Sequence, residues 1–305
     1  YAGKEAAGYI RAAFLSNESL NAVTFKENIE YKQVVRKLVD NVTFANATCD
    51  FTPTGTVTLT ERILVLEKFQ VHRQLCKKDF ASDWLAVEQG YSAFKVLPKS
   101  FQDFLVAHVA AKVAAKNETN IWEGVTANAG EYNGITTLIS TDAALPASQE
   151  VAGTTVTASN VITELGKIAD AIPSSLYTKD DLYIYVSQSI ARSYVRALGG
   201  FGASGLGANG TNALGTQWYN NGSLSFDGVK IFVANGMESN KAIATTKDNL
   251  FFGTGLLTDH TEVKIIDMSE IDGSQNCRVV MRLTAGVQYG IVEDIVTYGI
   301  TNAAN

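Results

Sequence analysis

The chain has 305 residues, of which 46% are hydrophobic and 18% charged, and 25 Lys and Arg against 31 Asp and Glu give a formal net charge of −6. This composition excludes intrinsic disorder, which requires low hydrophobicity and high net charge. The acidic balance also removes the basic signature of most nucleic-acid-binding proteins. The length predicts two domains, or one large domain with insertions.

Membrane insertion and disulfide bonding do not fit the sequence. No apolar run approaches the ~18–20 residues that a membrane-spanning helix requires, because Asp103, Lys112 and Lys116 interrupt the best candidate, residues 98–122. The first residues also lack the apolar core of a signal peptide. An odd number of widely spaced cysteines indicates reduced thiols; they are Cys49, Cys76 and Cys277. We therefore expect no membrane partner, and a protein that is made and used inside a cell or leaves it by lysis.

Residues 57–75 alternate between apolar and polar side chains over an unusually long stretch. At ~3.3 Å per residue the alternation predicts about 60 Å of extended chain, and typical strands span about a third of that length. Either a bend divides the stretch into two strands, or it projects beyond the body of its domain. The apolar positions are Val57, Leu59, Ile63, Val65, Phe69, Val71 and Leu75.

A second stretch with strand propensity, residues 34–44, precedes this one, and a turn containing Pro53 and Gly55 joins the two. We interpret residues 30–80 as a long two-stranded excursion. An isolated two-stranded hairpin is marginally stable in water. We therefore expect most of its apolar surface to be buried against a neighbouring subunit.

Residues 98–122 predict the clearest helix of the chain. Apolar residues recur at steps of three and four and form one stripe, and Pro98 suits the first turn of a helix. At ~1.5 Å per residue the helix would be about 37 Å long. We expect the closing strands of the same chain to cover the stripe, whose members are Leu97, Phe101, Phe104, Leu105, Val109 and Val113.

The rest of the chain predicts an α/β subdomain followed by closing strands. Two helices are expected, from Ser159 to just before Pro173 and from Ser187 to Leu198. Strands are expected over 134–138, 182–186, 229–234, 263–267, 279–283 and 295–300.

Residues 200–210 match the glycine pattern of dinucleotide-binding loops twice. That motif requires a preceding strand and a following helix, so that a pyrophosphate meets the helix N-terminus. Here a predicted helix precedes it, and Asn- and Gly-rich sequence follows. We therefore predict that residues 199–222 form a mobile surface loop that binds no nucleotide.

No other motif indicates catalysis or metal binding. The histidines are His72, His108 and His260, and none has the spacing of a zinc site. The chain also lacks a nucleophile elbow and a phosphate-binding loop ending in Lys-Ser/Thr. Cys76 stands beside two lysines, but no partner base can be identified for it. The sequence thus predicts no catalytic, cofactor-binding or metal-binding residue, no cofactor, and a protein that is not an enzyme.

The order of these elements resembles that of the major capsid protein of tailed bacteriophages, the Hong Kong 97-type fold shared with encapsulins and the herpesvirus capsid floor. Residues 246–267 are similar to the family's late segment, in which a small apolar-and-glycine motif leads to a strand. Residues 278–290 and 294–299 resemble its final strands, and residues 49–62 resemble the extended loop of one branch. The resemblance spans nearly the whole chain.

The resemblance implies an α+β fold with five parts. These are an N-terminal arm over residues 1–29, an extended β-hairpin loop over 30–80, a peripheral domain over 81–133 with a spine helix over 98–122, an α/β axial domain over 134–262, and closing strands over 263–305. The arm is expected to lie across a neighbouring subunit.

The resemblance also implies a function. It is that of a structural protein that self-assembles into hexamers and pentamers of an icosahedral shell around the double-stranded DNA genome of a tailed bacteriophage. The implied partners are further copies of the chain, portal, scaffold and decoration proteins, and packaged DNA through non-specific contact. The implied location is the virion capsid, assembled in the cytoplasm of the host bacterium. Two alternatives remain: an encapsulin-like shell that holds an enzyme cargo, and an α/β enzyme with an unrecognised site.

Overall fold

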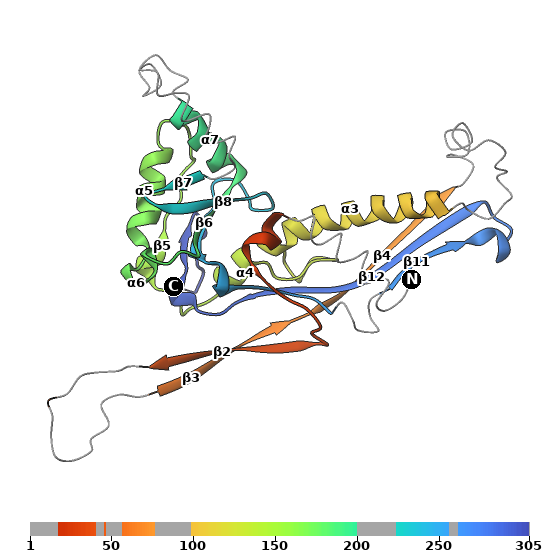
Figure 1. Cartoon of the computed structure of the whole chain (residues 1–305), viewed down its shortest axis with the longest axis horizontal. Coiled ribbons are helices and arrows are strands. Elements are labelled where there is room, and N and C mark those ends of the chain that lie inside the picture. The colour runs from red at the N-terminus through yellow and green to blue at the C-terminus, as the bar shows by residue number, and fades with distance from the viewer. Residues whose placement is uncertain are drawn as a thin grey trace.

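The computed structural model describes residues 18–40, 46, 57–76, 99–199, 224–255 and 262–304. Three parts are distinct in Figure 1. An α/β lobe lies at one end, a plate made of one long helix and a sheet extends from it, and a two-stranded hairpin leaves the plate at an angle. Among the described residues, no helix is long and apolar enough to cross a membrane.

The lobe is built on a mixed sheet of six strands in the order β5-β13-β9-β6-β8-β7. Its core joins this sheet to the helices, with Leu165, Ile184, Ile190 and Val296 in one buried cluster. The strands are β5 (Glu150–Val151), β6 (Leu182–Ser187), β7 (Leu224–Phe226), β8 (Val229–Ala234), β9 (Ala242–Thr246) and β13 (Val296–Tyr298); the helices are α5 (Val161–Ala171), α6 (Ser174–Tyr177) and α7 (Gln188–Gly199). The α/β subdomain predicted from the sequence is confirmed by these elements.

The plate is organised around β12 (Asn276–Tyr289). One half of β12 lies between β4 (Glu67–Cys76) and β11 (Glu262–Asp267), and its other half pairs with β10 (Leu250–Gly253). The long helix α3 (Lys99–Glu123) covers one face of this sheet. Short 3-10 helices complete the chain: η1 (Glu18–Ala22), η2 (Ala147–Gln149), η4 (Lys247–Asn249), η5 (Met268–Glu270) and η6 (Val292–Asp294).

The predicted packing of the long helix is confirmed where the structure describes it. Leu105 and Val109 are buried in the same cluster as Val279 and Met281 of β12, and Val113 packs against that cluster. The side chains of Phe101 and Phe104 lie outside the described residues. Burial of this stripe makes α3 and the sheet one rigid unit.

The hairpin consists of β2 (Lys32–Asp40) and β3 (Val57–Val65), paired antiparallel over nine residues each. The long alternating stretch is divided at Leu66, which is buried, into β3 and β4, so the first of the two alternatives holds. The β3 half also projects from the plate, as the second alternative expected (Figure 1). The bend lies tightly against β12. A Cβ added to Gly286 would be 2.2 Å from the carbonyl oxygen of Val65, so only glycine allows this approach.

The two-stranded excursion expected over residues 30–80 is therefore wrong over residues 67–76. β4 pairs with β12 along its whole length, and Phe69, Val71 and Leu75 pack on the plate core. Alternation with period two shows that a segment is extended with one covered face, but it does not reveal the partner that covers it. The apolar side of β4 is covered by its own chain.

The expected arm over residues 1–29 also needs correction in its described part. Leu20, Ala22 and Val23 are buried in the plate core, and β1 (Thr24–Lys26) pairs parallel with β10. Phe25 stacks on Phe252 with ring centroids 5.5 Å apart. These contacts hold residues 18–26 on their own chain because the segment has enough apolar surface to pack there. Residues 1–17 lie outside the described residues.

Residues 134–138, predicted as a strand, form the short helix α4 (Ile135–Ile139) instead. Its β-branched residues favour a strand, but the hydroxyls of Thr136 and Thr137 donate hydrogen bonds to the carbonyls of Trp122 and Gly124, at 2.7 and 2.8 Å. These carbonyls belong to the end of α3, where they lack helical partners. Tertiary contacts thus override the local propensity.

Candidate functional site

The hairpin carries exposed apolar side chains that nothing in the described chain covers. Tyr31, Val34, Leu59 and Ile63 are between 42% and 56% exposed. Val34 and Ile63 are opposite each other across the two strands, and Leu59 lies on the same face as Ile63 because side chains alternate along a strand. A two-stranded sheet with such a face is the kind of surface that binds another protein.

Three residues from separate elements fix the root of the hairpin, and we call them the root clamp. Arg62 of β3 donates from Nη2 to Oδ2 of Asp142 at 2.5 Å, and its guanidinium lies 4.5 Å from the ring centroid of Tyr289 in β12. The hydroxyl of Tyr289 donates to the same carboxylate at 2.6 Å. The root clamp joins the hairpin, the loop after α4 and the plate, so it sets the direction in which the hairpin leaves.

The root clamp also determines the charge state of Asp142. Burial acts to raise the pKa of this carboxyl, but hydrogen bonds from Tyr289, the backbone of Ala144 and Arg62 outweigh burial. The net result is a pKa below the ordinary value, so Asp142 stays ionised well into acid. Burial and the neighbouring carboxylate raise the pKa of the Tyr289 hydroxyl, which remains a donor.

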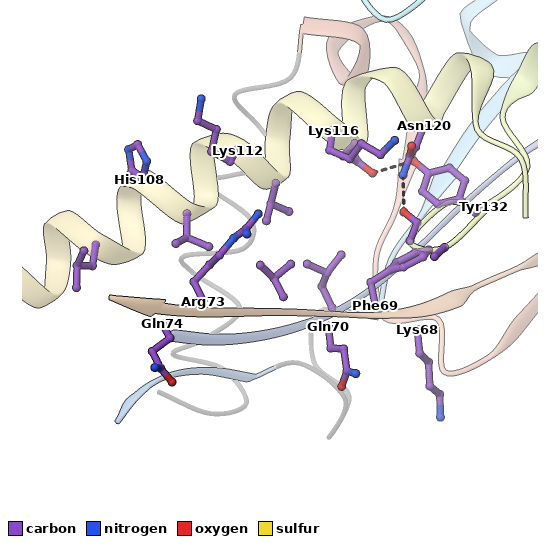
Figure 2. A pocket seen from close by; sticks show the side chains of 18 of the residues that line it. Lys68, Phe69, Gln70, Arg73, Gln74, His108, Lys112, Lys116, Asn120 and Tyr132 are labelled. Carbon is purple, nitrogen blue, oxygen red and sulfur yellow. Dashed lines mark hydrogen bonds between the residues drawn. The ribbon is translucent and has the colours of Figure 1, made fainter. Parts of the chain in front are cut away.

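A groove of about 870 Å³ runs between α3 and β4 (Figure 2). Its walls are apolar, with Phe69, Val71 and Leu75 from β4 and Leu105, Val109 and Val113 from α3. Arg73 extends from β4 toward the helix, whereas His108 and Lys112, which also line the groove, extend from α3 away from β4. Arg73 and Lys112 are exposed, and neither has an ion-pair partner among the described residues.

One end of the groove is closed by polar contacts around α3. The hydroxyl of Tyr132 donates to Oδ1 of Asn117 at 2.8 Å, and Nδ2 of Asn120 donates to the carbonyl of Gly130 at 3.1 Å. The remaining side-chain polar atoms of both asparagines, Nδ2 of Asn117 and Oδ1 of Asn120, are buried and have no hydrogen-bond partner. Buried polar groups without partners are uncommon, and this pair can bind an incoming donor and acceptor.

The charges at this end are balanced by an ion pair. Lys116 pairs with Glu131 at 2.5 Å. That hydrogen bond, with others from Asn128 and the backbone of Val125, lowers the pKa of Glu131 to about 2. Lys116 is thus neutralised, and the free positive charge of the groove comes from Arg73 and Lys112.

The opposite face of the plate is basic, although the chain as a whole is acidic. Arg278 pairs with Ile266 and Gln74 in the sheet register, and Arg282 pairs with Glu262 and Gln70, which places both arginines on the face away from α3. In Figure 2, Gln70 and Gln74 point away from the helix. The exposed cations of this basic face are Lys68, Lys264, Arg278 and Arg282.

The histidines and cysteines that the structure describes do not come together in one cluster. His72 is exposed on β4 and His108 is exposed on α3, while Cys76 and Cys277 are free thiols. Within the described part of the chain, no group of three or more His, Cys, Asp or Glu side chains could hold a metal ion. Cys49, His260 and the glycine-rich residues 200–222 lie outside the described residues. The predicted absence of nucleotide binding stays a prediction.

Comparison with known proteins identifies the fold. No protein-family model matches the sequence, and no curated protein matches it. Among solved structures, a capsid chain of an empty GTA particle matches with a TM-score of 0.60 and 10% identity, over 94% of this chain and 90% of that one. A chain from Mycobacterium phage Cain matches with a TM-score of 0.58 and 14% identity, over 93% and 91%.

A third solved structure comes from the procapsid of satellite phage P4, which includes the size determination (Sid) protein. Its TM-score is 0.54 at 11% identity, over 96% of this chain and 99% of that one. Because the likeness spans nearly the full length of each chain, this chain has the α+β fold of phage capsid proteins. The resemblance predicted from the order of elements is confirmed at the level of the fold.

Proposed function

We propose that the chain is a major capsid protein, which self-assembles into hexamers and pentamers of an icosahedral shell around the double-stranded DNA of a tailed bacteriophage. The role is structural, without catalysis and without a cofactor. Its location is the virion capsid, after assembly in the host bacterial cytoplasm. The fold shared with capsid chains supports this proposal, since that fold covers almost all of the sequence.

The observation that carries the proposal is the hairpin. β2 and β3 form a separate two-stranded sheet with exposed apolar side chains. Such a sheet is marginally stable alone, and an uncovered apolar face favours a partner protein. Another copy of the chain is the partner available in a homo-oligomer, and head-to-tail contacts between copies generate rings when the rotation between copies closes.

We assign the parts of the fold to capsid domains on this basis. The plate with α3 is the peripheral domain, including residues 81–133, β10 and parts of 263–305. The lobe is the axial domain expected over 134–262, without β10. The hairpin is the extended loop, limited in its described part to β2 and β3. The arm is limited to residues before the packed segment 18–26.

Particle formation tests the proposal directly. We expect the purified full-length protein to form uniform closed shells, visible by negative-stain electron microscopy. A small monomer or dimer at all concentrations would contradict the proposal and would favour an enzyme. Shells that copurify with an enzyme rather than DNA would favour the encapsulin-like alternative.

A first prediction concerns the exposed face of the hairpin. Changing Val34 and Ile63 together to serine should abolish or strongly reduce shell formation and leave the melting temperature of the subunit nearly unchanged, because surface changes usually shift stability by about 0.5 kcal/mol or less. Particle yield and thermal unfolding measure the two effects. The matched control is Ile162→Ser, which removes an equally exposed apolar side chain from α5. Normal shells from the double variant would show that the hairpin face is not an assembly surface.

A second prediction concerns non-specific contact with DNA, which we propose for the basic face. Lys264→Glu and Arg278→Glu should weaken binding of duplex DNA uniformly across sequences and reduce the salt slope by about 1 for each lost phosphate contact. Fluorescence anisotropy at several salt concentrations measures both quantities. Lys179→Glu, at an exposed site of the lobe, is the control. An unchanged slope would mean that the basic face does not contact DNA.

We also propose portal, scaffold and decoration proteins as partners. The P4 procapsid includes a size determination protein, which supports an accessory protein as a partner for a chain of this fold. Copurification of particles with neighbouring gene products would test each partner in turn.

A further inference from the structure

The turn between β11 and β12 presents an apolar side chain at a negatively charged tip. We call residues 267–273 the acidic turn. Ile271 is 68% exposed, the highest exposure among the large apolar side chains of the described residues. Glu270 and Asp272 flank it in the sequence, and Asp267 begins the turn. The acidic turn contains no basic residue.

The acidic turn is held in one conformation. Oδ1 of Asp267 accepts hydrogen bonds from the backbone N–H and the hydroxyl of Ser269, at 3.0 and 2.7 Å. The N–H groups of Ile271 and Asp272 both donate to the carbonyl of Met268, whose side chain is buried. Gly273 supplies the positive φ of +73° that ends the turn. A preorganised loop loses little conformational entropy on binding.

The groove between α3 and β4 is complementary to the acidic turn in shape and charge. It has apolar walls, two exposed cations, Arg73 and Lys112, and a buried donor and acceptor without partners on Asn117 and Asn120. A loop that carries an apolar side chain between acidic side chains would satisfy all three features. The backbone amide groups of a bound loop are the donors and acceptors that the two asparagines lack.

The acidic turn does not reach the groove of its own chain. Asn276 pairs with Cys76 at the last position of β4, so the turn extends beyond the end of the strand that forms the groove wall. Figure 1 shows β11 and β12 meeting at the end of the plate remote from the lobe. At this end β12 is paired on both sides, with β4 and with β11.

We propose that the acidic turn of one copy docks into the groove between α3 and β4 of a second copy, with Ile271 among the apolar walls and the negative charges next to Arg73 and Lys112. The contact is heterologous, and contacts of this type generate closed rings when the rotation between successive copies closes. This inference rests on the proposed self-assembly and names two surfaces that meet.

Charge reversal with rescue tests the contact in the full-length protein. Asp272→Lys and Lys112→Glu should each lower the particle yield by about tenfold or more, because like charges facing each other across an interface destabilise it. The double variant should regain yield toward that of the unmodified protein. Ile271→Ser should reduce yield without rescue by any charge change. Ile162→Ser and Lys179→Glu are matched controls on the lobe, and circular dichroism verifies folding.

The outcomes separate this contact from the proposed function. Unmodified protein that forms no particles would contradict the proposed function itself. Shells from the unmodified protein and from every single variant would overturn the docking contact while the function stands. Loss of yield in the groove variant alone, with normal shells from Asp272→Lys and Ile271→Ser, would mean that another partner occupies the groove and would also overturn the proposal.

Discussion

Replacing Trp122 with alanine is expected to lower the free energy of unfolding by about 3–5 kcal/mol, the usual loss for a large buried aromatic side chain. Trp122 is fully buried at the end of α3, and its ring lies 5.4 Å from that of Tyr185 in the lobe. Its Nε1 donates to the hydroxyl of Ser19 at 2.8 Å. One side chain thus connects the plate, the lobe and the N-terminal segment.

Urea denaturation of the subunit measures this loss. Trp122→Phe is the matched control, since it keeps most of the apolar volume and removes the hydrogen bond to Ser19. It should lose much less stability than the alanine variant. If Trp122→Ala lowered the free energy of unfolding no more than Trp122→Phe, the junction between plate and lobe would not depend on this side chain.

Breaking the root clamp is the second change with a large expected effect. Asp142→Ala removes the carboxylate that accepts hydrogen bonds from Arg62 and Tyr289. Both donors are then partly buried without an acceptor, which typically lowers the free energy of unfolding by about 1–3 kcal/mol. The hairpin should also lose its fixed direction. Hydrogen exchange of β3 near Arg62, together with denaturation, measures the two consequences.

The hairpin offers a matched control for this experiment. Arg36 and Glu61 form an ion pair at 2.9 Å farther out on the hairpin, where their side chains are 65% and 46% exposed. Ion pairs as exposed as this one contribute about 0–1 kcal/mol to the stability of a protein. Glu61→Ala should therefore have little effect. Equal effects of Glu61→Ala and Asp142→Ala would show that the root clamp has no special role.

The root clamp also predicts a dependence on pH. The pKa of Asp142 is lower in the folded chain than its ordinary value. Such a group stabilises the fold above the unfolded pKa of about 3.9, and this contribution disappears as the pH falls through the folded value. The stability difference between the unmodified protein and Asp142→Asn should accordingly be constant near neutral pH and shrink below about pH 4. A difference that did not change with pH would exclude ionisation of Asp142 as its source.

The sequence predicted the elements whose pattern is set locally. The stripe of α3 and the buried strand β6 follow from spacing alone, and the whole order of elements indicated the capsid fold. The sequence did not predict which strand covers which face. β3 and β4 have one continuous alternation, yet β3 pairs with β2 and β4 pairs with β12. Pairing partners depend on contacts between residues far apart in the chain.

The candidate sites were the least predictable part. In the root clamp, Arg62 is 80 residues from Asp142, and Tyr289 is 147 residues from it. No local motif joins them, and their only sequence signal is an arginine on the polar side of an alternating strand. The groove likewise combines α3 with a strand that the sequence assigned to an outward loop. Spacing along a chain does not reveal such contacts before the topology is known.

The bend at Leu66 makes the hairpin a separate module. Because the partner strand changes there from β2 to β12, the register of β2 with β3 is set independently of the register of β4 with β12. Adding two residues to each hairpin strand beyond the root clamp would keep every side chain on its present face. The plate would not shift, since Gly286 and Val65 fix the crossing point. The reach of the hairpin can therefore vary among related chains while the body that carries it stays the same.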